Sequence, residues 1–361
     1  MIYMQSTTFK NKEDNEMNMF KKLISLALIV LVLTGITVGC DKKTVEIADP
    51  SNVKTTTFDD SFTGDSIDEV WLDGGAFVDI ALEMVPLTAS PASSILMPSA
   101  PGTTTKKNDK AEIDYSNAKD GYVMIKYLKQ TTKALRVQIK GPDGTAYTYT
   151  LKSDGSYETF PLSAGDGDYT VGVFEQVDGT KFSASNSATV TVKLADQNAP
   201  FIRPNQYVNY KTDSEVVKKA AELIKDAKTI NDKIKNVYEY VVKNFTYDKD
   251  LAATVKAGYL PDVDAVLAKK KGICFDYAAV MTAMLRSQNI PTKLVVGYTG
   301  EQYHAWINVY STETGWINSV IYFDGKSWKL MDPTFASSAK ESSDVMKYIG
   351  DGKNYTVKYL Y

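Results

Sequence analysis

Hydrophobic and polar residues alternate in short runs between residues 110 and 196. The runs read GYVMIKYL, LRVQIKG, AYTYTLK, GDYTVGVFEQV and SATVTVKL, and the turn sequences GPDG, SDGS and AGDGD separate them. Alternation with a period of two places one side of each strand in a core, and turns at this spacing are typical of a β-sandwich. The pattern therefore predicts an all-β sandwich over residues 110–196.

A helical period replaces the alternation in the next part of the chain, residues 205–361, which we take as a second domain. Residues 214–227 and 231–245 repeat hydrophobic side chains at i, i+3/i+4 and i+7, which predicts two amphipathic helices. Asp213 and Asn231 are candidate N-caps for them, because their side chains can accept hydrogen bonds from free backbone N–H groups.

The N-terminal region carries an apolar run bounded by charge. Lys21 and Lys22 precede the run LISLALIVLVLTGITVG, which stops at Cys40. A basic stretch, an apolar run and small residues before a cleavage point predict a secretory signal over residues 1–40. The end of the run is similar to a bacterial lipobox, which makes Cys40 the candidate lipidation site. Thr37 stands where that pattern prefers Leu, so an uncleaved transmembrane anchor or an ordinary signal stays open.

The segments before and after this apolar run are polar in composition. Residues 1–16 do not look like part of a signal, so a translation start at Met17 or Met19 is an open alternative. Residues 41–109 are rich in Ser, Thr, Pro and Asp, as in SPASSILMPSAPGTTTKKND. Such a composition favours a linker or a loosely ordered stalk.

Length, charge and residue counts exclude several classes of protein. A chain of 361 residues is longer than one ordinary core requires, which agrees with two folded domains. The formal net charge of −3 provides no positive field for phosphates, so we expect no nucleic-acid partner. With two cysteines and one histidine, the chain favours neither a disulfide framework nor a zinc site. We therefore expect no metal and no cofactor.

Cys274 lies in the most informative stretch, KKGICFDYAAVMTAMLRSQNIPTKLVVGY. Gly272 supplies a turn, and residues 275–286 predict a largely buried helix that ends before Pro291. A cysteine at a helix N-terminus lies against free N–H groups and the positive end of the helix dipole, which favour its thiolate. The alternative for this cysteine alone is a buried structural thiol, which is common.

The single histidine follows in the segment EQYHAWINVY. Alternation puts His304, Trp306 and Asn308 on one face of a predicted strand and Tyr303, Ala305, Ile307 and Val309 on the other. A further strand is predicted in KSWKLMDPTF, and Asp332 ends it because proline cannot continue a ladder. A carboxylate there can accept the imidazole N–H and fix its tautomer. Taken singly, His304 fits a structural role and Asp332 an ordinary turn.

Together these three motifs resemble the transglutaminase-like superfamily. The family's core carries G-x-C-x-x-[YF]-A, then H-A-W, then D-P-T, and this chain has GICFDYA around Cys274, HAW from His304 and DPT from Asp332, in that order. The resemblance covers roughly residues 210–340. It implies Cys274 as nucleophile, His304 as base and Asp332 as the orienting acid. The segment between His304 and Asp332 is longer than in compact members, and Tyr247 is a weak candidate for the second oxyanion donor.

The resemblance also implies the fold. We expect an α+β, papain-like transglutaminase core, with helices packed on an antiparallel sheet, preceded by the all-β sandwich. That sandwich is similar in architecture to the immunoglobulin-like modules of bacterial surface proteins, without their cysteine pair. Because fold alone does not imply binding, a spacer is its simplest role.

The chemistry implied is acyl transfer through a thioester, and hydrolysis by a peptidase or amidase is favoured over cross-linking. The expected partners are a protein or peptide substrate, with a cell-wall peptide among the candidates, and a membrane reached through the lipid anchor. The expected location is extracytoplasmic. A non-catalytic cell-surface lipoprotein that uses the same scaffold for binding is the alternative from another class.

Overall fold

The computed structural model describes residues 55–57, 94–300, 302–318, 321–323, 328–330 and 355–361. All of them belong to one compact unit that spans residues 48–361. The predicted signal with Cys40, most of the predicted linker and Asp332 lie outside these residues. Among the helices described, none combines the length and apolar character that crossing a membrane requires.

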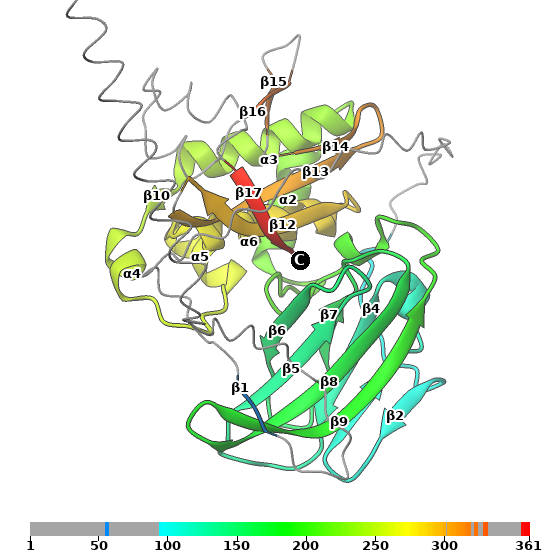
Figure 1. Ribbon diagram of the computed structural model, residues 1–361. Helices are drawn as coiled ribbons and strands as arrows, with labels where there is room; N and C mark the ends of the chain where they lie inside the picture. Colours follow the sequence, from blue (N-terminus) through cyan, green and yellow to red (C-terminus); the bar gives the residue numbers. More distant parts are fainter. Residues whose placement is uncertain (1–54, 58–93, 301, 319–320, 324–327, 331–354) are drawn as a thin grey trace, which may run out of the picture. The chain divides into compact units, whose positions relative to one another are not determined.

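The first part of the described chain consists of two antiparallel sheets, which can be followed in Figure 1. The five-stranded sheet has the order β1 (Thr55–Thr57), β9 (Lys181–Val192), β8 (Gly167–Asp178), β5 (Leu135–Lys140) and β6 (Ala146–Thr150). The four-stranded sheet has the order β2 (Thr105–Lys107), β3 (Ala111–Asp114), β4 (Tyr122–Tyr127) and β7 (Glu158–Pro161). The alternating runs thus form strands, whereas the immunoglobulin-like topology and the domain boundaries stay predictions. Strands β1 and β2 come from the segment predicted as a linker.

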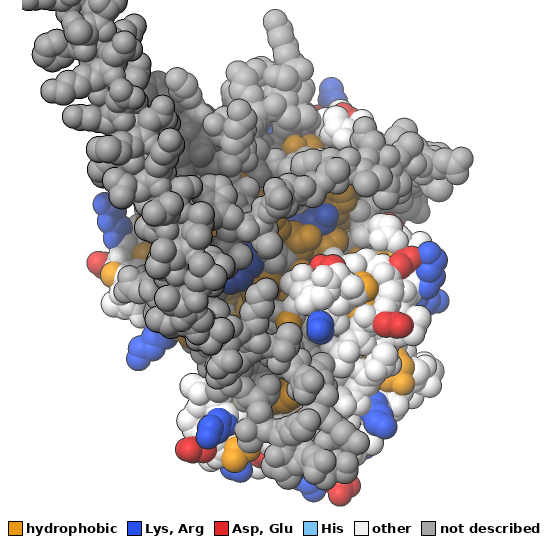
Figure 2. All heavy atoms as spheres, viewed as in Figure 1, with side chains coloured by type: hydrophobic (Ala, Val, Ile, Leu, Met, Phe, Trp, Pro, Cys, Tyr) orange, Lys and Arg blue, Asp and Glu red, His pale blue; other side chains and the backbone are white. Residues whose placement is uncertain are grey.

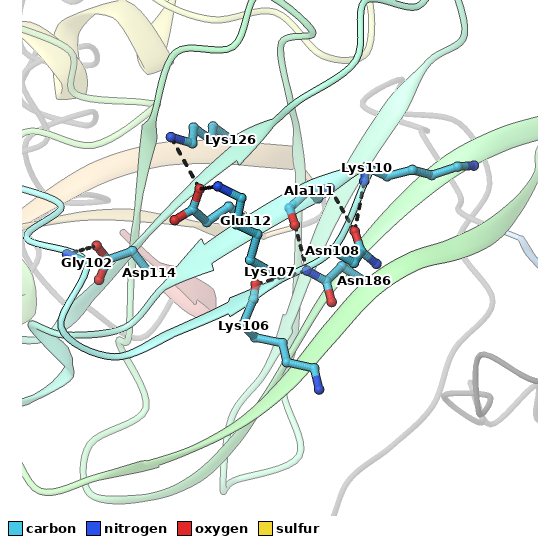
Figure 3. A network of polar contacts seen from close by, with 10 residues as sticks. All are labelled: Gly102, Lys106, Lys107, Asn108, Lys110, Ala111, Glu112, Asp114, Lys126 and Asn186. Atoms are coloured by element: carbon cyan, nitrogen blue, oxygen red, sulfur yellow. Dashed lines mark hydrogen bonds and ion pairs between the residues drawn. The ribbon is translucent and has the colours of Figure 1, made fainter.

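A buried asparagine joins the two sheets, as Figure 3 shows. The Asn186 side chain on β9 donates hydrogen bonds to the carbonyl oxygens of Lys106 and Ala111, at 3.0 and 2.9 Å. A buried amide is stable only when its hydrogen bonds are satisfied, so this contact fixes how β9 lies against β2 and β3. On β3, Glu112 forms ion pairs with Lys107 and Lys126, each at 3.3 Å.

Five α-helices follow within the described residues, and the two amphipathic helices predicted from the sequence are confirmed. They are α2 (Glu215–Ile224), α3 (Ile230–Asn244), α4 (Lys249–Thr254), α5 (Val263–Lys269) and α6 (Cys274–Ser287). The predicted caps are wrong. Ser214 occupies the N-cap of α2, and Thr229 caps α3 in a reciprocal pair with Asp232. Asn231 instead bonds Ser311 and Glu313 through its side chain.

A second antiparallel sheet accompanies these helices. Its order is β14 (Gly315–Ile317), β13 (Gln302–Ser311), β12 (Thr292–Thr299) and β17 (Tyr355–Leu360). Two short pairs complete the described strands: β10 (Thr246–Tyr247) with β11 (Lys271–Gly272), and β15 (Ile321–Phe323) with β16 (Trp328–Leu330). Single turns of 3₁₀ helix occur at Ala118–Asp120 and Ala199–Phe201. Helices packed on an antiparallel sheet confirm the α+β prediction.

Arg286, at the end of α6, is fully buried and ties three segments together. Its guanidinium donates hydrogen bonds to the carbonyl oxygens of Thr292, Arg203 and Tyr361, at 2.9, 2.8 and 2.6 Å. Burial lowers the pKa of Arg286 to about 10. The three carbonyl groups offset part of the cost of burying the cation, and they fix the C-terminal end of α6 against β12 and β17.

Side chains of both charges are interspersed on the face of the molecule drawn in Figure 2, among uncharged and hydrophobic ones. Several exposed ion pairs lie along the helices, as between Lys218 and Glu215 at 2.7 Å. Pairs of this kind stabilise a helix by only a few tenths of a kcal/mol, roughly 0.3–0.5. Buried contacts therefore hold the described core together.

Candidate active site

Cys274 is the first residue of α6, and it is a free thiol that is half-buried. The rest of the helix, residues 275–287, is buried, which confirms the helix predicted from the sequence. The first N–H groups of a helix have no partner within it, and they carry the positive end of its dipole. The fold therefore holds a partly accessible thiol at the end of a helix where negative charge is favoured.

The turn before Cys274 is shaped by a contact between Gly272 and Asp276. A Cβ atom on Gly272 would lie 2.6 Å from the Cβ of Asp276, closer than real Cβ contacts permit. Asp276 is fully buried, and its Oδ2 accepts the backbone N–H of Ile273 at 2.8 Å. This is the carboxylate half of a capping box, since the N-cap residue Ile273 has no polar side chain of its own. Glycine at position 272 is thus required by close packing.

His304 lies on β13, the strand against which α6 packs. Ala305, Ile307 and Val309 on this strand belong to the buried core and Tyr303 packs against it, so these four residues share a face, as alternation predicted. Alternation puts His304 and Trp306 on the other face, where both are buried and their rings stack with centroids 6.3 Å apart. Both faces of β13 are thus buried at this end.

Tyr303 shows that this end of β13 lies close to the candidate nucleophile. Burial raises the pKa of Tyr303, and the charges of neighbouring tyrosines and of Cys274 raise it further. His304 is the next residue along the strand and pairs with Gly297 on β12. The structure thus brings Cys274 and the strand that carries His304 together. A bond between the thiol and the imidazole stays a prediction.

Tyr247 lies beside the turn that carries Cys274. Strands β10 and β11 pair in parallel, with Tyr247 opposite Gly272, and the Asp248 N–H donates to the Gly272 carbonyl at 2.9 Å. Tyr247, which precedes Cys274 by 27 positions in the sequence, is therefore a neighbour of the turn that carries the nucleophile. The position of Tyr247 beside this turn is compatible with its role as the second oxyanion donor, for which the sequence made it a weak candidate.

Two of the predicted site residues lie outside the described part of the chain. Asp332 follows β16 by two positions, and the strand at Trp328–Leu330 confirms the strand predicted before it. Cys40 also lies outside, so the predicted lipidation site stays a prediction. Within the described ranges, no group of three or more His, Cys, Asp and Glu side chains is placed to hold a metal ion.

The sequence of this core matches a known family. Residues 217–319 match the profile of the transglutaminase-like superfamily, a range that includes Cys274, His304 and the strands and helices that position them. This stretch of the chain is a transglutaminase-like core.

One relative is similar to this chain over a short part of its length. The YebA protein of Bacillus subtilis is 31% identical over 118 residues, which cover 27% of this chain and 16% of YebA. This chain therefore spans only a small part of that relative.

Two solved structures are similar to this chain at a low level. A candidate cysteine protease of Cytophaga hutchinsonii is 15% identical, with a TM-score of 0.34, and the match covers 66% of this chain and 76% of that protein. A transglutaminase of red sea bream is 13% identical, with a TM-score of 0.25, and the match covers 59% of this chain and 48% of that protein. Similarity at this level carries no argument about activity or substrate.

Proposed function

We propose that the chain is a cysteine-dependent acyl-transfer enzyme that cleaves amide or peptide bonds through a thioester. His304 takes the proton of the Cys274 thiol, the sulfur attacks the carbonyl carbon, and the imidazolium passes that proton to the departing amine as the C–N bond breaks. The resulting thioester then reacts with water, from which His304 removes a proton, to release the acid and restore the thiol. Asp332 holds the imidazole in the tautomer that this exchange needs.

One observation carries the proposal: a half-buried, free thiol begins a helix that is otherwise fully buried and packs on the strand of the only histidine. A structural thiol would have no need of the helix N-terminus. At that position free N–H groups favour the charged, nucleophilic form of the sulfur.

Two groups are proposed to stabilise the oxyanion that forms during attack. The first is the backbone N–H of Cys274, which is free because it belongs to the first turn of α6. The second is the Tyr247 hydroxyl, supported by the pairing of Tyr247 with Gly272. Loss of one such donor lowers the rate of proteases that use an oxyanion hole roughly 100-fold to 1000-fold. Tyr247→Phe should therefore slow acylation without unfolding the chain.

Hydrolysis is proposed as the main outcome, with transfer to an amine as the competing one. The two are separated by adding glycine ethyl ester to a reaction with casein and analysing the peptides by mass spectrometry. New peptide ends or deamidated glutamines support hydrolysis. If most products carry the added amine, the enzyme is a transferase.

The thioester is tested with p-nitrophenyl acetate, which acylates activated thiolates and releases a coloured phenolate. The full-length protein should release about one equivalent in a rapid burst and gain one acetyl group on the peptide containing Cys274. Peptide mapping separates this site from Cys40. Cys274→Ala is the matched control, because it removes the sulfur with little change in volume. A burst of equal size in Cys274→Ala would refute the catalytic role and favour the non-catalytic binding protein.

The location is a separate proposal. If Cys40 is lipidated, residues from 41 onward face outside the cytoplasm, and the two or three acyl chains on such a cysteine give stable anchoring. Intact mass of the native protein tests this directly: the expected mass is that of residues 40–361 plus the acyl groups. An unprocessed mass without acylation would instead support a transmembrane anchor. Cys40→Ser should abolish the acyl addition.

A further inference from the structure

Tyr259 makes a direct contact with the carboxylate behind the candidate nucleophile. It lies in the segment between α4 and α5, where its side chain is half-buried and packs against the core. Its hydroxyl donates a hydrogen bond to Oδ1 of Asp276 at 2.7 Å. The other oxygen, Oδ2, accepts the N–H of Ile273 at 2.8 Å. One carboxylate thus joins Tyr259 to the residue directly before Cys274.

Groups with opposing effects set the pKa of Asp276. Burial raises the pKa of Asp276, while the Tyr259 and Ile273 hydrogen bonds lower it; of the charges that face it, Asp248 raises its pKa and Lys269 lowers it. The net effect of these groups is an upward shift. Removing the Tyr259 hydroxyl must raise the pKa of Asp276 still further, because a hydrogen bond to the charged form is lost.

A protonated Asp276 would hold the turn less well. A neutral carboxyl group is a weaker acceptor for the Ile273 N–H, and it can turn its own O–H toward other groups. The Ile273 backbone sets the position of both the Cys274 sulfur and the Cys274 N–H. A shift of about 1 Å in a reacting group costs roughly 100-fold in rate.

We propose that Tyr259 is a positioning residue for Cys274, which it holds in its reactive geometry through Asp276. This role rests on the proposed function, since it assumes that Cys274 is the nucleophile. Tyr259 itself touches no reacting atom, and its effect passes through the Asp276–Ile273 hydrogen bond.

The test compares Tyr259→Phe with the wild type and with Tyr240→Phe. Tyr240 lies on α3, outside the candidate site, and the centroid of its ring is 6.2 Å from that of Phe245. Two rates are followed from pH 4 to 9: alkylation of Cys274 by iodoacetamide, read by peptide mapping, and the p-nitrophenyl acetate burst. Circular dichroism melting checks that each variant is folded.

Tyr259→Phe should lower both rates roughly 10-fold to 100-fold near neutral pH and move the acidic limb of each profile to higher pH. Tyr240→Phe should overlay the wild type. Asp276→Asn should lose activity similarly, without the shifted acidic limb, and Tyr259→Phe should add little to it. If Tyr259→Phe folds poorly, the rates of the single variant Asp276→Asn still test whether the Asp276 carboxylate positions Cys274.

Alkylation and acylation profiles of Tyr259→Phe that match those of the wild type would overturn the positioning role. Failure of the proposed function would look different, because the wild type itself would show no burst. If the wild type shows no burst, the alkylation rates of Cys274 in the wild type and in Tyr259→Phe still decide whether Tyr259 positions the thiol.

Discussion

Gly272→Ala is the substitution whose effect follows most directly from the packing around Cys274. The new Cβ would lie 2.6 Å from the Cβ and 2.8 Å from Oδ2 of Asp276. Carbon atoms in contact prefer a separation of about 3.5–4.0 Å, so the turn and α6 must separate by about 1 Å. Asp276 is buried and bonded on both sides, so it has little freedom to yield.

Two contributions set the magnitude of the effect. Overpacking of a dense interior costs about 1–3 kcal/mol. Weakening one hydrogen bond to a buried carboxylate adds about 1.5–3 kcal/mol. When Asp276 moves away from the new Cβ, the overpacking is relieved but the hydrogen bond to Ile273 is weakened, so the two costs do not add in full. We expect the free energy of unfolding to fall by about 2–5 kcal/mol. The alkylation rate of Cys274 should fall with it, since the same contact positions the thiol.

Urea unfolding followed by tryptophan fluorescence measures the change, because Trp306, on the strand against which α6 packs, is only 1% exposed. Gly144→Ala is the matched control: its φ is +84° and a Cβ there meets nothing within 4 Å, so it costs only backbone strain of about 1–2 kcal/mol. Gly272 lacks a positive φ, so its cost is steric. A Gly272→Ala protein as stable as the wild type would refute the argument from packing.

Three further changes test other parts of the account. Asp332→Asn should fold normally by circular dichroism and lose most of the acetylation burst, though less than Cys274→Ala, because the amide can favour the wrong imidazole tautomer; an unimpaired burst would reduce Asp332 to a turn residue. Arg286→Met should lower the free energy of unfolding by about 3–5 kcal/mol, because three carbonyl groups lose their donor, and an unchanged melting temperature would contradict this. Burial lowers the pKa of Lys293 to about 8 from 10.5, so the unfolded chain binds more protons between these values and stability should rise with pH across them. In Lys293→Met, the free energy of unfolding measured with urea should not rise between these pH values. An identical pH dependence in the variant and the wild type would refute the lowered pKa of Lys293.

Most of the secondary structure of the core was predictable because its hydrophobic periods are strong. The face of α2 formed by Val216, Val217 and Ala220 is buried, as the spacing required. The caps were not predictable to the residue, since several polar residues precede each helix and each can accept a hydrogen bond. Thr229 is the N-cap of α3 because Asp232, three positions later, completes the reciprocal pair of hydrogen bonds with it. That capping pattern was visible in the sequence.

The candidate site was predictable as three motifs, whereas its supporting contacts were not. Periodicity places Cys274 at a helix start and His304 on a strand, but it cannot say which distant side chains reach them. Tyr259 and Tyr247 approach the turn only because loops and the β10–β11 pair fold back on it. Asp276 carried a local signal, since an acidic residue three positions after an N-cap commonly accepts the N–H of the cap.

The most direct test of the central claim is the alkylation rate of Cys274 as a function of pH, measured for the wild type and for His304→Ala. If Cys274 and His304 form a catalytic pair, iodoacetamide should alkylate wild-type Cys274 near neutral pH much faster than it alkylates a free cysteine, because the imidazolium stabilises the thiolate. His304→Ala should lower the alkylation rate near neutral pH, because the positive partner of the thiolate is lost. Two curves that overlay would contradict the account, since they would mean that His304 does not act on Cys274.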